Sequence, residues 1–212
     1  MSNDILPYYD FSIPLALSVE QRFHKSVQLV RDMQKLLEKI DYGTDTILIP
    51  STGSSPEEFV QLQTYLGIEL PEEYGAFLQK WRSLRVDYSE VYGPESGFGP
   101  WVSDEHDPLH KYLVVGKCKS FSDGDELLIE LDQPEQRVFQ YVYEAWVYVD
   151  VPGAKIELYA PSFSLAIWRL IHDWYNWFVT ECDVYEDIQE TDPRRAEQIR
   201  NLVLYPGEGR PC

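Results

Sequence analysis

The chain has 212 residues, of which 44% are hydrophobic and 14% aromatic, enough to bury one sizeable core but a tight fit for two independent domains. Its 18 basic and 36 acidic side chains give a formal charge of −18 at pH 7. Such a charge repels phosphates, and no stretch of the sequence gathers basic residues into a stripe, so direct nucleic-acid binding is not expected.

The N-terminal sequence "MSNDILPYYDFSIPLALS" lacks the basic n-region of a secretory signal. No apolar run approaches the roughly 18 residues that a membrane-spanning helix needs. The three cysteines, Cys118, Cys182 and Cys212, are widely spaced and form no CxxC pair, so we predict neither a disulfide framework nor a zinc knuckle. These features together predict a soluble, cytoplasmic protein without a membrane segment.

Ser18 to Ile40 is predicted to form the first helix, because Ser18 and Gln21 make a capping box ahead of apolar residues at three- and four-residue steps. "TDTILIP" then reads as a short strand or an extended link. The small-residue loop "STGSSP" is the predicted boundary between an N-terminal helical extension, residues 1–50, and a domain at residues 51–180.

Two further helices are predicted next. Ser55 and Glu58 form a second capping box, with Pro56 at the first helical position, and Gly67 ends this helix. The following helix lies in "LGIELPEEYGAFLQKW", residues 66–81. Its proline suits the first turn, its two glutamates oppose the positive end of the helix dipole, and one apolar face is formed by Tyr74, Phe77, Leu78 and Trp81.

Residues 84–109, rich in Gly, Pro, Tyr and acid, are predicted to form a long and partly irregular loop. β-Branched and aromatic runs follow at 112–120, 126–132, 137–144 and 145–151, and "IELYA" adds a last short strand. They predict a mostly antiparallel meander of about four to six strands flanked by helices, which is an α+β fold. Ser162 is then predicted to cap a long helix. A final helix, from Asp192-Pro193 to about Val203, lies in a C-terminal segment, residues 181–212, packed on or beside the domain.

Catalytic and metal-binding patterns are weak. His106 and His110 are four residues apart among acidic residues, but Pro108 favours a loop and the glutamate of an HExxH motif is missing. "SDGDE", residues 122–126, lacks the later bidentate glutamate of a calcium loop and reads as a hairpin turn. We therefore predict no catalytic residues, no metal and no cofactor. A metal-dependent enzyme built on His106 and His110 is kept as an alternative.

Aromatic side chains flanked by acids occur in the irregular segment rather than on a periodic helix or strand. This combination is typical of a protein-binding surface, although the aromatics could equally serve to anchor the loop on the core. The predicted contact residues in the segment are Tyr88, Tyr92, Trp101, Asp104, Glu105 and Asp107. A second candidate surface is the turn that holds Asp123, Asp125 and Glu126.

The order of these elements resembles the SMI1/KNR4 family, also called the SUKH superfamily, over roughly Ser51 to Trp177. The family pattern LP-x-x-Y-x-x-F-L is matched at residues 70–78, a glycine of the central strand is matched by Gly116, and the closing S-F helix is matched by Ser162-Phe163 with Ile167. Residues 1–50 have no counterpart in a minimal domain of this family.

The resemblance implies a non-catalytic binding module, in bacteria typically an immunity protein that neutralises a polymorphic toxin of the nuclease or deaminase type. A nuclease presents a basic active-site face, which an acidic protein complements. We therefore expect a cognate protein toxin as the partner. The alternative is an intracellular regulator or scaffold with the same fold, acting for example through its N-terminal helix.

Overall fold

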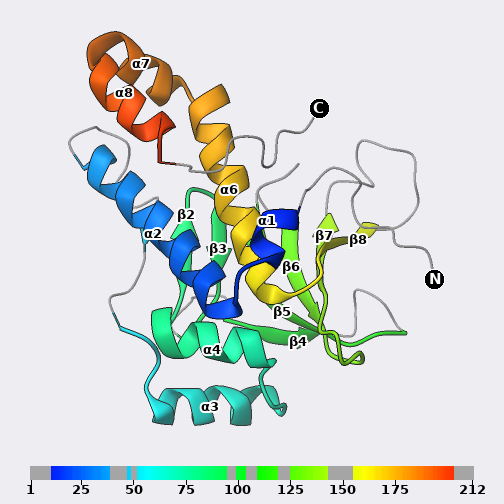
Figure 1. The fold of residues 1–212 in the computed structure, drawn as a ribbon. Helices are drawn as coiled ribbons and strands as arrows, with labels where there is room; N and C mark the ends of the chain where they lie inside the picture. Colours follow the sequence, from blue (N-terminus) through cyan, green and yellow to red (C-terminus); the bar gives the residue numbers. More distant parts are fainter. Residues whose placement is uncertain are drawn as a thin grey trace.

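A computed structural model of the chain describes residues 11–38, 47–48, 52–94, 99–103, 109–118, 125–142 and 155–202. Within these ranges the protein has seven helices and one eight-stranded antiparallel sheet, and the helices flank the sheet (Figure 1). The predicted α+β class is therefore confirmed.

The sheet has the strand order β1-β2-β3-β5-β6-β7-β8, and β4 also pairs with β5. Strands β3 and β4 pair with opposite ends of β5, through Gly116 and Lys117 for β3 and through Tyr112 to Val114 for β4. The strands are β1 (Ile47–Leu48), β2 (Leu84–Val86), β3 (Ser89–Val91), β4 (Trp101–Ser103), β5 (Tyr112–Cys118), β6 (Asp125–Glu130), β7 (Val138–Val142) and β8 (Lys155–Ala160).

The predicted meander is present as β5 to β8, each strand antiparallel to the next. The strand predicted at 145–151 lies outside the described residues. The segment at 84–109 differs from its prediction as a loop, because it contributes β2, β3 and β4 and raises the sheet beyond the predicted four to six strands. Each of these strands has only three residues and is held by its pairing with neighbours, so its sequence shows no usable periodicity.

The five predicted helices are confirmed, with ends shifted by a few residues, and α1 and α7 are additional helices. Both predicted capping boxes are formed, by Ser18 with Gln21 and by Ser55 with Glu58. The helices are α1 (Ser12–Leu15), α2 (Val19–Leu37), α3 (Pro56–Leu66), α4 (Glu72–Trp81), α6 (Phe163–Glu181), α7 (Asp183–Thr191) and α8 (Pro193–Arg200).

The main core lies between one face of the sheet and a helical layer in which α2 packs along α6 (Figure 1). Because side chains alternate along a strand, Leu113 and Val115 of β5 enter this core while Tyr112 and Val114 lie in a smaller cluster on the opposite face. Met33 of α2 is fully buried in the main core, so the N-terminal helix shares that core with the rest of the chain. The domain boundary near residue 50 stays a prediction.

The start of α6 is stabilised differently from the prediction. Ser162 occupies the N-cap position but its side chain makes no capping hydrogen bond. Instead, the Glu73 carboxylate of α4 accepts a hydrogen bond from the backbone N–H of Ser164, at 2.6 Å. A side chain from another helix thus satisfies one of the N–H groups that every helix leaves unpaired at its start.

Among the helices in the described ranges, none is both long enough and apolar enough to cross a membrane.

Candidate protein-binding site

The predicted aromatic residues divide into exposed and packed side chains. Tyr88 lies in the turn between β2 and β3 and is 50% exposed. Tyr92 is buried, and its ring stacks on that of Trp101 with 6.0 Å between centroids. Trp101 is partly exposed beside the smaller cluster. Tyr88 is thus the predicted aromatic residue that the structure presents most openly.

The predicted acidic residues that the structure describes are both buried. Asp125 is fully buried and accepts a hydrogen bond from the Gln140 side chain at 3.0 Å. Glu126 lies on β6 and is 8% exposed. Neither carboxylate is therefore presented on the surface for a partner. The remaining predicted residues, Asp104, Glu105, Asp107 and Asp123, lie outside the described residues.

A pocket of about 310 Å³ lies where Asp87 and Ser89 of the β2–β3 hairpin meet β8 and α6. We call it the α6 pocket. Three carboxylates and three aromatic side chains line it: Asp87, Asp173, Glu181, Tyr159, Trp174 and Trp177. None of the residues that line the pocket is among the predicted contact residues. Part of the pocket could be seen in the sequence of α6, where Asp173, Trp177 and Glu181 follow at four-residue steps and so share one helix face.

The turn that closes the α6 pocket is a two-residue hairpin loop, since Val86 pairs with Ser89. Asp87 has a positive φ of 51°, a conformation that tight hairpin loops require and that aspartate tolerates better than most residues. This geometry places an acidic residue at the pocket and leaves the next residue, Tyr88, exposed.

Among the described residues that line the α6 pocket, three are acidic and none is basic, and Arg169 contacts one of the three carboxylates. Arg169 Nε lies 3.3 Å from Asp173 Oδ2, and its Nη1 donates to the Tyr159 carbonyl at 2.9 Å. Burial raises the pKa of Asp173 to about 6, and the charge of Arg169 only partly opposes that rise. The three acidic side chains give the described lining of the pocket a net negative charge when all are ionised.

Two buried polar groups lie in or near the α6 pocket, the indole of Trp174 and the thiol of Cys182. Trp174 is 5% exposed, and its indole Nε1–H has no hydrogen-bond partner although the residue lines the pocket. Cys182, just after α6, is a buried free thiol. Burial raises the pKa of Cys182, and the charges of Asp87 and Asp183 raise it further, which is consistent with a negative potential here.

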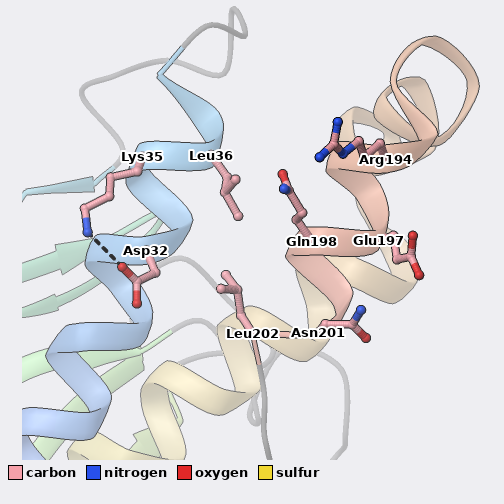
Figure 2. A pocket seen from close by; sticks show the side chains of 8 residues that line it. All are labelled: Asp32, Lys35, Leu36, Arg194, Glu197, Gln198, Asn201 and Leu202. Carbon is pink, nitrogen blue, oxygen red and sulfur yellow. Dashed lines mark hydrogen bonds and ion pairs between the residues drawn. The ribbon is translucent and has the colours of Figure 1, made fainter.

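A second cavity, of about 540 Å³, lies between α2 and α8 (Figure 2). Its lining mixes the two signs of charge, with Asp32 bound to Lys35 at 2.9 Å and with Arg194 close to Glu197 in sequence. Leu36 and Leu202 supply apolar surface. This balance of charges does not favour a cation or an anion, so the cavity is a weaker candidate for a charged partner than the α6 pocket.

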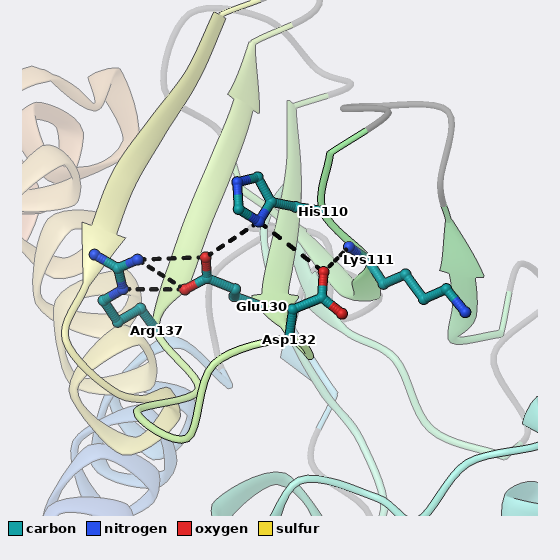
Figure 3. Close-up of polar contacts among 5 residues, drawn as sticks. All are labelled: His110, Lys111, Glu130, Asp132 and Arg137. Carbon is teal, nitrogen blue, oxygen red and sulfur yellow. Dashed lines mark hydrogen bonds and ion pairs between the residues drawn. The ribbon is translucent and has the colours of Figure 1, made fainter.

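His110, considered above as a metal ligand, belongs to a charged cluster at one end of the sheet (Figure 3). Its Nδ1 lies 3.9 Å from Glu130 and 4.0 Å from Asp132. Both carboxylates already have partners, because Arg137 binds Glu130 and the backbone N–H of Lys111 donates to Asp132. His106 lies outside the described residues, and among the residues within them no group of three His, Cys, Asp or Glu side chains could hold a metal ion.

His172 is a structural histidine. It is 4% exposed, stacks on the Trp168 ring at 4.3 Å, and its Nδ1 lies 2.8 Å from the Trp168 carbonyl, which can only accept. Burial lowers its pKa to about 4, against the raising effect of that hydrogen bond, so the ring is neutral near pH 7.

Comparison of the chain with protein-family models and with curated proteins found no match.

Proposed function

We propose that the chain is a non-catalytic protein-binding module that neutralises a cognate protein toxin, of the nuclease or deaminase type, by covering the basic face around the toxin's active site. Carboxylates of the module would occupy sites that the toxin uses for substrate phosphates, and aromatic side chains would anchor the contact. Inhibition of this kind needs no turnover.

The positions of the family-like residues support the first half of this proposal. Tyr74, Phe77 and Leu78 are fully buried on α4, and the Tyr74 hydroxyl donates to the Tyr92 carbonyl at 2.8 Å. Gly116 allows the β3 backbone to approach β5 closely. These residues serve the scaffold, which is what a binding module needs if its surface alone selects the partner.

The observation that carries the second half is the α6 pocket together with the short β2–β3 hairpin that supplies part of its lining. The pocket combines net negative charge with three aromatic side chains, and the hairpin exposes Tyr88, the residue after Asp87. Tyrosine is enriched among residues that dominate binding energy, and a rigid turn loses little entropy when it binds.

The test is a protection assay in which the reading frame next to this gene is expressed in a bacterium with and without the protein, and survivors are counted. Survival only in the presence of the protein is expected. A neighbouring product that is harmless alone would contradict the toxin assignment, and a pull-down aimed at regulatory partners would then test the scaffold alternative.

The surface assignment is tested with Tyr88→Ala in the same assay. We expect the variant to protect less well. Binding of the partner by the unchanged protein should also weaken as salt is added, because the complementary charges are screened. Tyr65→Ala is the matched control, since Tyr65 is a 79% exposed tyrosine on α3. Equal loss in both variants, or no loss in Tyr88→Ala, would remove the hairpin from the binding surface.

A further inference from the structure

We propose that the α6 pocket is the receptor for a single basic side chain, lysine or arginine, carried by a peptide segment of the partner. This inference rests on the proposed function only for the identity of the partner. The chemistry of the pocket can be tested without any toxin.

The charges of the lining favour an organic cation. Asp87 reaches the pocket from the β2–β3 turn, and Asp173 and Glu181 reach it from positions about two turns apart on α6. Arg169 is only 16% exposed and is held by Asp173 and by the Tyr159 carbonyl, so its guanidinium already has partners. An incoming cation therefore meets more negative than positive charge, and the partly buried setting screens this attraction less than open solvent would.

The aromatic lining favours the same ligand. The Arg169 guanidinium lies 4.2 Å from the centre of the Tyr159 ring, so one ring of the pocket already packs against a cation. Trp174 and Trp177 line the remaining wall, and Trp177 is partly exposed. Indole faces attract ammonium and guanidinium groups more strongly than the other aromatic rings do, and they also pack against the methylene stem of such a side chain.

The size of the pocket and the indole of Trp174 indicate that the cation arrives on a peptide. A volume of about 310 Å³ is at the small end of ligand sites and suits one long side chain. The buried Nε1–H of Trp174 lacks an acceptor, and a buried donor without a partner is costly. Solvent does not reach this N–H in the unbound protein, so the indole would have to turn toward the pocket; a peptide carbonyl beside the basic side chain would then supply the acceptor, whereas a simple amine would not.

The experiment is an NMR titration of the ¹⁵N-labelled full chain, observed at the indole N–H signals of Trp174 and Trp177. The probes are the N-acetyl, N-methylamide derivatives of lysine and arginine, the same derivative of norleucine as an uncharged analogue, and butylamine as a cation without carbonyls. We expect saturable shifts of both indoles with lysine or arginine, weaker binding of butylamine, and no saturation with norleucine.

The variant Asp173→Asn/Glu181→Gln should weaken binding of the lysine probe about tenfold, because two charges that attract it are lost. Glu186→Gln/Asp187→Asn is the matched control: it removes two carboxylates from exposed positions of α7 and should leave binding unchanged. Should the pocket variant fold poorly, salt dependence in the unchanged protein replaces it, and the lysine affinity should fall as NaCl rises.

Saturation by the norleucine probe, equal binding of butylamine and the lysine derivative, or equal weakening in both double variants would each overturn the proposal. A failed protection assay with intact lysine binding would refute the toxin assignment alone. Protection that survives Asp173→Asn/Glu181→Gln, together with absent lysine binding, would refute the pocket alone.

Discussion

The Glu73 carboxylate on α4 accepts a hydrogen bond from the backbone N–H of Ser164, the second residue of α6, with 2.6 Å between Oε2 and N. The two residues are 91 positions apart. Ser164 is also reached from α2, since Arg22 Nη1 donates to its hydroxyl at 2.9 Å. Three helices therefore meet at the start of α6, where the positive end of the helix dipole favours a carboxylate.

Glu73→Ala is expected to lower the free energy of unfolding by about 1–2 kcal/mol, the usual cost of losing a helix cap. Urea denaturation measures the change. Glu72→Ala removes the neighbouring, exposed carboxylate of the same helix and should cost less than about 0.5 kcal/mol. Similar losses in the two variants would show that the Glu73–Ser164 bond contributes little.

Gly116→Ala should destabilise the protein by about 1–3 kcal/mol through overpacking. A Cβ at this position would lie 2.2 Å from the Glu90 carbonyl oxygen of β3, next to the bulge of β5, so the strand would have to move. Thermal unfolding measures the loss.

Gly67→Ala is the informative comparison for that variant. A Cβ on Gly67 meets no atom within 4 Å, but its φ of +68° disfavours alanine by about 1–2 kcal/mol. Rescue by asparagine, which tolerates this conformation, is expected at position 67 and not at 116. Rescue at both positions would contradict the close approach of β3 and β5.

Arg137→Met should cost about 2–3 kcal/mol of unfolding free energy, because Glu130 is 2% exposed and would keep a buried charge without its main partner. Figure 3 shows the ion pair of Arg137 with Glu130. Because Arg137 is itself 42% exposed, the expected loss of unfolding free energy is smaller than for a fully buried pair. Adding Glu130→Gln should recover part of the loss. Lys35→Met breaks the exposed pair with Asp32 and should change stability by less than about 0.5 kcal/mol.

The pH dependence of stability should become steeper in Asp173→Asn. The lowered pKa of His172, about 4 in the folded state, gives stability that is present above pH 6.5 and is lost as the pH falls toward 4. The raised pKa of Asp173, about 6, acts in the opposite sense, because the folded state binds that proton more tightly as the pH falls through 6. The two effects therefore partly cancel between pH 4 and 6.

Without the Asp173 carboxylate, the loss of stability that His172 causes is no longer offset by Asp173. The charge that acts on the pKa of Asp173 is that of Arg169, and the variant keeps Arg169 as well as the other two carboxylates of the pocket, Asp87 and Glu181. Midpoints of urea unfolding at pH 4.5, 5.5 and 6.5 measure the slope. A slope equal to that of the unchanged protein would contradict the raised pKa.

Several helices could be predicted from short-range sequence signals. The Ser18–Gln21 and Ser55–Glu58 boxes form as predicted, and Gly67 ends α3 in the left-handed conformation. The apolar face of α4 is buried as its spacing indicates. Such signals involve residues within one or two helical turns, so the local sequence contains all the atoms that decide them.

The short strands were predicted poorly for the opposite reason. Leu84–Val86, Ser89–Val91 and Trp101–Ser103 gain their hydrogen bonds from pairing, and two of them depend on β5, which begins at Tyr112. Three residues are too few for the alternation of apolar and polar side chains to be recognised.

The candidate site could be predicted only in part. The sequence drew attention to Tyr88, which is exposed, but also to Asp125, whose carboxylate is buried against Gln140. The α6 pocket brings Asp87 next to Asp173 and Glu181, which are more than eighty residues away in the chain. The spacing of residues within one segment does not predict that two distant segments line the same pocket.

The sequence by itself determined the strong negative charge of this protein, the α+β class, and the ends of those helices that are capped by their own neighbours. The tertiary structure decided which carboxylates are buried, that Glu73 rather than Ser162 caps α6, and that acidic and aromatic residues from two distant segments share one pocket. The physical reason is range: capping and periodicity depend on groups a few residues apart, whereas burial and local potential depend on every segment that packs nearby.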